Sequence, residues 1–221
     1  MRQARTVATR EESTVSEGTA GTGTRQSRRG FGGLDKLQQT TFRVEGDSEV
    51  IVFLEDDNFT YALRHWIKYR DPENPQNTLT RVEYCLEDDC PLCDIADRPK
   101  PTAFFNVVDL TLPNKVLVWE ATSDPTKAIQ KEFNKLAKRG LGLADDKVYW
   151  VISKELGKNN FYSYSVDKLT EEELLAEWPK LTPITPAQRD ALRHRAYDES
   201  YVQYKTREEL QEFVDSLDAV S

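Results

Sequence analysis

All three cysteines of this 221-residue chain lie in one short segment, CLEDDCPLC, which runs from Cys85 to Cys93. Cys90 and Cys93 form a C-x-x-C knuckle, whose two thiolates can reach one tetrahedral ion, and Cys85 lies just upstream. A disulfide scheme would leave one cysteine over, because the count is odd. The segment therefore indicates one structural zinc ion, which needs a fourth ligand for a closed site.

The chain has two histidines that could supply this ligand, His65 and His194. His65 lies at the end of an aromatic β-type run shortly before the knuckle. His194 lies in LRHRAY between two arginines, which disfavour a nearby dication. We predict that His65 completes the site with Cys85, Cys90 and Cys93. Carboxylate ligation in place of His65 stays open, because acidic residues would also balance the charge of the ion. The candidates are Asp88, Asp89 and Asp94.

Two other uses of the cysteines fit the sequence less well. A thioredoxin-like pair begins a helix after a strand in a βαβ unit, and the sequence does not indicate such units. A catalytic zinc keeps one open position beside a carboxylate acid or base, and no H-x-E motif accompanies the knuckle. We therefore expect that the protein is not an enzyme. The competing interpretation, a metallohydrolase, would explain only the metal site.

Six segments between Phe42 and Val166 are rich in Val, Ile and aromatic residues and are bounded by turn-forming residues, which is typical of β-strands. They are residues 49–54, 59–67, 103–110, 115–121, 147–153 and 160–166. Strands at this spacing favour a barrel or a sandwich. One helix is predicted between them, from Ser123 or Asp124 to just before Gly140. Its lysines form a stripe that is either a solvent face or a secondary track for phosphates: Lys127, Lys131, Lys135 and Lys138.

Charge and composition divide the chain into three parts. Residues 1–33 are rich in Ser, Thr and Gly and carry six Arg against three Glu, which predicts a flexible basic arm. Residues 34–166 form the strand-rich core. Residues 167–221 carry thirteen acidic against seven basic side chains, and three capping boxes predict three short helices there. The order of elements predicts a mainly β, α+β chain with a helical acidic C-terminal segment.

The sequence also bears on location. No apolar run approaches the roughly 20 residues that a membrane helix needs, and the segment after Met1 lacks the order of a secretory signal. We therefore expect a soluble protein in a reducing compartment, where thiols stay free unless a metal holds them.

The order of these pieces resembles the zinc-containing single-stranded DNA-binding protein family of T-even-like tailed phages. The resemblance lies in a His near the end of an early strand, followed by a Cys and then by C-P-x-C. It extends to EVIVFLED before the His segment, to AFFNVVDL…NKVLVWEATSDPTKAIQKEFNKL, and to the late acidic TREELQEFVDSL. In order and spacing it covers about residues 45–215.

The resemblance implies an OB-fold, a five-stranded Greek-key barrel, with a structural zinc subdomain inserted at about residues 60–100 and helices at the C-terminus. It implies that the protein coats transient single-stranded DNA without sequence specificity during phage replication, recombination and repair. Self-association along DNA, contacts of the acidic C-terminus with replication and recombination proteins, and the cytoplasm of an infected bacterial host are further implications. We also expect the acidic segment to compete with phosphate for the basic groove.

The residues agree with this expectation on physical grounds. A protein that binds a single strand without reading its sequence needs aromatic faces for bases and cations for phosphates. The sequence interleaves the two types, and the predicted contacts are Tyr61, Arg64, Trp66, Lys68, Tyr69, Arg70, Arg81, Lys100, Phe105, Lys154, Lys158 and Tyr162. The alternative is a zinc-bearing replication or transcription adaptor without direct single-stranded DNA binding, which explains the knuckle and the acidic segment but gives no reason for exposed aromatics.

Overall fold

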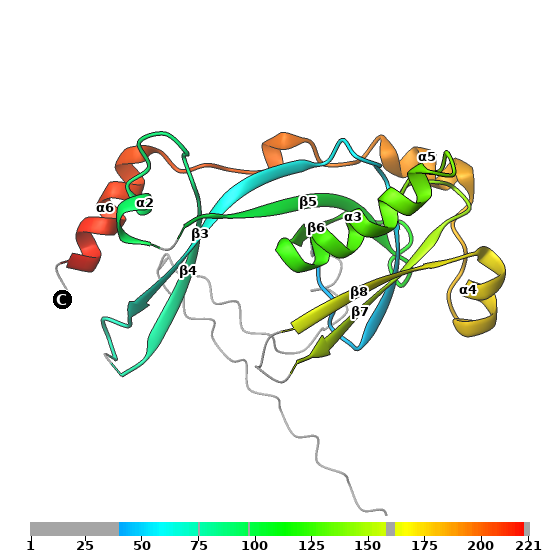
Figure 1. Ribbon diagram of the computed structural model, residues 1–221, viewed down its shortest axis with the longest axis horizontal. Coiled ribbons are helices and arrows are strands. Elements are labelled where there is room, and N and C mark those ends of the chain that lie inside the picture. The colour runs from blue at the N-terminus through cyan, green and yellow to red at the C-terminus, as the bar shows by residue number, and fades with distance from the viewer. Residues whose placement is uncertain (1–39, 75, 97, 158–161, 219–221) are drawn as a thin grey trace, which may run out of the picture. The chain divides into compact units, whose positions relative to one another are not determined.

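Eight strands form one sheet in the computed structural model, which describes residues 40–74, 76–96, 98–157 and 162–218 (Figure 1). The predicted basic arm and Lys158 lie outside the described residues. The strands are β1 (Thr41–Phe42), β2 (Ser48–Phe53), β3 (Thr60–Arg70), β4 (Thr78–Tyr84), β5 (Lys100–Asp109), β6 (Leu117–Ala121), β7 (Tyr149–Leu156) and β8 (Tyr162–Leu169). The helices are α2 (Leu92–Ile95), α3 (Ser123–Ala137), α4 (Glu171–Glu177), α5 (Pro186–Arg193) and α6 (Arg207–Asp218), with a 3₁₀ turn, η1 (Glu199–Tyr201).

The strands follow the order β1-β6-β5-β2-β7-β8, and β3 pairs with both β5 and β4. The β1–β6 pair is parallel and the other pairs are antiparallel. This mixed sheet with a few helices confirms the predicted α+β class with its β-rich core. Among the described strands, β1 and β8 end the path without pairing to each other, so the sheet does not close into a barrel.

Both faces of the central strands are buried. Ile51 and Phe53 of β2 face α3 together with Phe105 of β5, whereas Val52 of β2 and Val108 of β5 face the opposite side. A strand that is covered on both faces reads as a continuous apolar run, which explains the sequences EVIVFL and AFFNVVDL. Figure 1 shows α3 lying across one face of this sheet.

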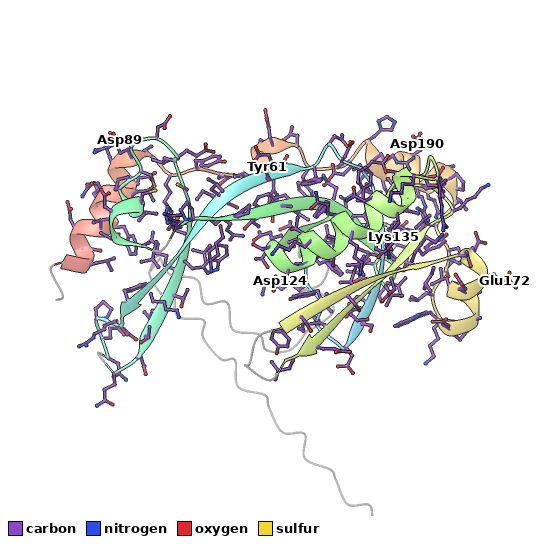
Figure 2. The ribbon with its side chains drawn as sticks, in the orientation of Figure 1. Tyr61, Asp89, Asp124, Lys135, Glu172 and Asp190 are labelled. Atoms are coloured by element: carbon purple, nitrogen blue, oxygen red, sulfur yellow. The ribbon has the colours of Figure 1, made fainter. Side chains whose placement is uncertain are left out.

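Helix α3 is amphipathic, as its sequence predicts. Ile129 and Leu136 are buried against the sheet, whereas the four lysines of the stripe are exposed. Lys135, which is labelled in Figure 2, pairs with Glu132 at 2.5 Å. The stripe is therefore open to solvent, which both interpretations of it require.

The C-terminal segment covers the face of the sheet opposite α3. Leu174 of α4 and Leu192 of α5 pack on one end of the sheet, and Val202 after η1 packs on Phe104 of β5. The three predicted capping boxes are confirmed. In each, the threonine hydroxyl accepts the backbone N–H of the Glu or Gln three residues on, and the side-chain oxygen of that Glu or Gln accepts the backbone N–H of the threonine. Residues 170–218 thus pack on the sheet, which includes β8, as part of the same unit, Gln39–Ser221.

A buried amide fastens this segment to the sheet. The Asn106 side chain accepts the N–H of Tyr197 at 2.8 Å and donates to its carbonyl at 2.9 Å, as a neighbouring strand would. The same amide group donates to Glu55, whose carboxylate also accepts the backbone N–H of Asn106 at 2.7 Å. Burial raises the pKa of Glu55, and these hydrogen bonds oppose the rise.

We expect Gly142→Ala to destabilise the fold by roughly 1 to 3 kcal/mol, the usual cost of overpacking. A Cβ atom at Gly142 would lie 2.0 Å from Oδ1 of Asp56, the same oxygen that accepts the N–H of Ala144. Gly46→Ala is the matched control, because a Cβ atom there meets nothing closer than 3.8 Å. Urea denaturation of both variants measures the difference, and equal free energies of unfolding would contradict this account of the loop.

Candidate metal centre and the basic hairpin

Four potential metal ligands converge at the base of the β3–β4 hairpin. His65 lies on β3, Cys85 directly follows β4, Cys90 lies in the next loop, and Cys93 lies on α2. The antiparallel pairing places His65 opposite Glu83, and the Cys85 N–H donates to the carbonyl of Leu63 at 2.8 Å. The strand pairing thus brings residues about 20 apart in sequence to one point.

The distances between the ligand atoms suit a tetrahedral ion. Sγ of Cys85 and Sγ of Cys93 are 3.7 Å apart, and Nε2 of His65 lies 3.5 Å from Sγ of Cys93 and 3.9 Å from Sγ of Cys90. A tetrahedron with ordinary zinc bond lengths has edges of about 3.8 Å between sulfurs and about 3.5 Å between sulfur and nitrogen. All four atoms lie within 4.8 Å of one another, so the group could hold one metal ion.

The three cysteines form no disulfide, and the surroundings of Cys85 and Cys93 disfavour their thiolate forms. A disulfide needs sulfurs about 2.05 Å apart, much closer than the 3.7 Å between Cys85 and Cys93. Burial raises the pKa of Cys85 to about 12, and burial also raises the pKa of Cys93. Reactive thiols have a lowered pKa, so these cysteines suit a cation that displaces their protons better than they suit redox or nucleophilic chemistry.

The loop between Cys85 and Cys90 adopts an unusual backbone. Glu87 and Asp89 have φ angles of 62° and 53°, in the left-handed region that non-glycine residues rarely adopt. The Glu87 N–H points at Sγ of Cys85 at 3.3 Å. This turn therefore sets the direction of one ligand and supplies it with a hydrogen bond.

The structure distinguishes between the fourth ligands that the sequence left open. The group contains His65, which is fully buried, and the acidic residues of the loop take no part in it. Asp89 instead accepts a hydrogen bond from Nε of Arg207 at 2.7 Å, and it lies on the loop beside α2 and α6 in Figure 2. His194 is exposed at the end of α5, near Asp190.

Helix α6 covers the metal-ligand group. Leu210, Phe213 and Val214 pack with Ile67 of β3 and Leu92 of α2, and Cys85 and Cys90 belong to the same apolar cluster. Lys205, just before α6, pairs with Glu83 of β4. The spacing of the apolar residues predicts the helix, but nothing in the sequence indicates that this helix covers the knuckle.

One face of the hairpin gathers five of the predicted DNA contacts. Alternate residues of β3 point to the same side, and Lys100 of β5 is paired with Arg64. We call this set the basic strip: Arg64, Trp66, Lys68, Arg70 and Lys100. Its Arg64 lies 5.8 Å from the ring of Trp66 and 5.3 Å from that of Tyr84, and it pairs with Glu120 at 2.7 Å. Lys68, Arg70 and Lys100 are exposed.

Other predicted contacts lie elsewhere. Tyr69 and Arg81 point to the opposite face of the hairpin, toward α6. Tyr61, which is labelled in Figure 2, lies on β3 and is 68% exposed. It lines a hollow of about 290 Å³ with Pro101 and Lys127.

The remaining contacts belong to two other places. On the β7–β8 hairpin, Nζ of Lys154 lies 4.7 Å from the ring of Tyr162, and it also donates to the carbonyl of Val44 at 2.6 Å. The structure corrects the prediction that Phe105 contacts DNA. This residue is only 1% exposed and packs against Phe53, Phe59 and Trp119. A ring buried in this core has no free face on which a base could stack, so Phe105 is removed from the set of predicted DNA contacts.

A row of aromatic rings was missing from the predicted set. Tyr84 lies 5.4 Å from Tyr204, measured between ring centroids, and Phe104 lies 6.1 Å from Tyr84 and 6.0 Å from Tyr201. Burial raises the pKa values of Tyr84, Tyr201 and Tyr204, so these side chains stay neutral at ordinary pH. The two closely spaced tyrosines of YVQY could have suggested an aromatic surface, but the sequence does not show that they contact the sheet.

Comparison with protein-family models, with curated proteins and with solved structures found no match to this chain. In the part of the chain that the structure describes, no helix has the length and apolar character needed to cross a membrane.

We expect His65→Ala and Cys90→Ser to abolish stoichiometric metal binding and to lower the stability of the hairpin and α6, because each change removes one of four ligands. His194→Ala is the control, since it removes the other histidine without touching the group. Elemental analysis of purified protein and thermal unfolding measure both effects. Full metal content or unchanged stability in either ligand variant would contradict the assignment.

Proposed function

We propose that this protein binds single-stranded DNA without sequence specificity, through the basic strip of the β3–β4 hairpin. The observation that carries the proposal is a row of cations beside an aromatic ring, on a hairpin whose base holds the metal-ligand group. The resemblance seen in the sequence supports coating of transient single strands in phage replication, recombination and repair, within the cytoplasm of an infected host.

The charges of the strip suit a phosphate backbone. Among the residues that the structure describes, no carboxylate pairs with Lys68, Arg70 or Lys100. Such cations release counterions from a bound strand, and this gain does not depend on base sequence. The chain as a whole carries a net charge of −8, so the strip is a local positive region on an acidic protein.

The aromatic residues supply the second half of the interaction. Trp66 is half-buried within the strip, with the Arg64 guanidinium near its ring. A base that stacks on such a ring gains roughly 1 to 3 kcal/mol whatever its identity, because every base has a π-face. Cations and a ring in one row therefore favour a single strand, whose bases are free to stack, over a duplex.

The ion that we propose is one structural zinc. Three thiolates and one imidazole are donors that zinc prefers, and four protein ligands leave no open position for a substrate. When bound, the ion would neutralise the thiolates and tie β3, β4 and α2 together. This arrangement supports a binding protein and gives no support to an enzyme.

The strand order supports the OB-fold as part of the proposal. Strands β2, β5 and β6 follow one another as antiparallel neighbours, and β7 returns to pair with β2 on its free side. A Greek key has this arrangement, with the fourth strand beside the first. The OB-fold is a partly open five-stranded Greek-key barrel, and β8 would be its fifth strand. On this interpretation the β3–β4 hairpin and α2 are an insertion between the first two strands.

We expect the double variant Lys68→Ala, Arg70→Ala to bind oligo(dT) more weakly and with less dependence on salt. Loss of two phosphate contacts should reduce the slope of log affinity against log salt by about 1.4, at about 0.7 per contact on a single strand. The matched control is Lys147→Ala, Lys180→Ala, which removes the same charge from exposed positions elsewhere. Tryptophan fluorescence during titration at several salt concentrations measures both quantities.

Two outcomes would contradict the proposal. If the unmodified protein, with its metal bound, does not bind oligo(dT) at low salt, the adaptor interpretation takes first place. If the two double variants lose affinity equally, the effect comes from net charge and the hairpin is not the binding surface.

A further inference from the structure

A groove of about 760 Å³ lies between the β3–β4 hairpin and helix α6. Its volume is within the range of pockets that enclose small ligands, roughly 300 to 1,000 Å³. Both elements contribute to its lining, with Lys68, Tyr69 and Arg70 from β3 and Phe213 from α6. Lys68 and Arg70 of the basic strip also line the groove, although they alternate with Tyr69 along β3. Among the described strands, β3 beyond Arg64 pairs with β4 alone, so a bound strand would pass from the strip to the groove around this edge of β3.

Aromatic rings form one part of this lining. The rings of Tyr69 and Phe213 meet edge to face, with centroids 5.8 Å apart and an interplanar angle of 81°. The guanidinium of Arg81 lies over the Phe213 ring, 4.0 Å from its centre, and so covers one face of that ring. These contacts hold the rings in place before any ligand arrives, which lowers the entropy cost of binding.

The free positive charge of the groove comes from Lys68 and Arg70. Arg81 is already balanced, because Glu83 accepts hydrogen bonds from both Arg81 and Lys205. Lys68 and Arg70 are exposed, and in the described part of the chain no acidic side chain pairs with either. Aromatic rings beside two uncompensated cations suit a ligand that is both planar and anionic.

We propose that this groove binds nucleotides of the single strand, with a base against the half-buried ring of Tyr69, which packs on the buried Phe213, and the adjoining phosphate beside Lys68 and Arg70. The inference rests on the proposed function, because it takes single-stranded DNA as the ligand. It also changes the role expected for the acidic C-terminal segment. Helix α6 supplies one wall of the binding groove and covers the metal-ligand group, so its docking supports DNA binding.

The first test separates bases from phosphates. Tyr69→Leu removes the ring, and we expect it to weaken binding of a short oligo(dT) by about fivefold or more, as loss of one stacking contact implies. Against an abasic oligomer of the same length, which keeps the phosphates, the same variant should bind as the unmodified protein does. Tyr69→Phe keeps the ring and should recover most of the affinity lost in the leucine variant.

The second test leaves the aromatic wall intact. Ser216 is an exposed residue of α6 that lines the groove. Ser216→Glu places a negative charge there and should weaken oligo(dT) binding several-fold at low salt, whereas Ser216→Arg should strengthen it. Gln203→Glu, an equal charge change at an exposed position that does not line the groove, is the control and should have a smaller effect.

The outcomes separate the two claims. If Tyr69→Leu weakens both oligomers equally or neither, and if Ser216→Glu matches Gln203→Glu, the groove is not a base site and this inference is overturned. The proposed function would still stand if Lys68→Ala, Arg70→Ala loses affinity in the same assay. If the unmodified protein binds neither oligomer, the proposed function itself fails.

Discussion

The convergence of His65, Cys85, Cys90 and Cys93 is the constraint on which the hairpin depends. A two-stranded hairpin has no core of its own and is marginal in water. Here the strands extend beyond β5, and the four ligands join them to α2 while Leu210 and Val214 of α6 cover the junction. Without an ion, the buried thiols of Cys85 and Cys90, the exposed thiol of Cys93 and a buried imidazole would be a poor replacement for an apolar core. The proposed zinc therefore stabilises the same element that carries the proposed binding surface.

The C-terminal segment gives the sheet its second covered face. Pieces of it pack on three separate apolar clusters, and Asn106 holds its backbone midway through two hydrogen bonds to Tyr197. The segment is acidic in sequence, but its apolar residues are used in packing. Two of its basic side chains form ion pairs, Lys205 with Glu83 of the hairpin and Arg207 with Asp89 of the loop that follows it. Net charge alone therefore describes it poorly. Tyr201 of the segment and Arg64 of the basic strip both contact the Glu120 carboxylate, so the segment borders the strip.

Much of the metal-ligand group could be predicted from the sequence, but less of the proposed DNA-binding surface could. The knuckle has a fixed ligand spacing, and with two histidines in the chain the choice of His65 needed only its neighbours. Capping boxes and apolar runs are local signals, so α3 to α6 and six of the eight described strands followed from them, whereas β1, β4 and α2 were not predicted. In contrast, AFFNVVDL is covered on both faces and shows no alternation, so nothing separated the core ring of Phe105 from exposed rings. That Tyr69 and Arg81 face α6 depends on a contact between residues more than 130 positions apart in the chain, which a single sequence does not reveal.

The most direct test of this account compares one protein in two states, with its metal bound and after removal of the metal by a chelator. Both states are titrated with oligo(dT) at low salt, while circular dichroism reports whether the sheet stays folded. The account predicts tight, salt-sensitive binding by the metal-loaded protein and much weaker binding by the stripped protein, with most of the sheet retained. Equal affinity in the two states, or absence of binding in both, would contradict the claim that a metal-organised hairpin binds the single strand.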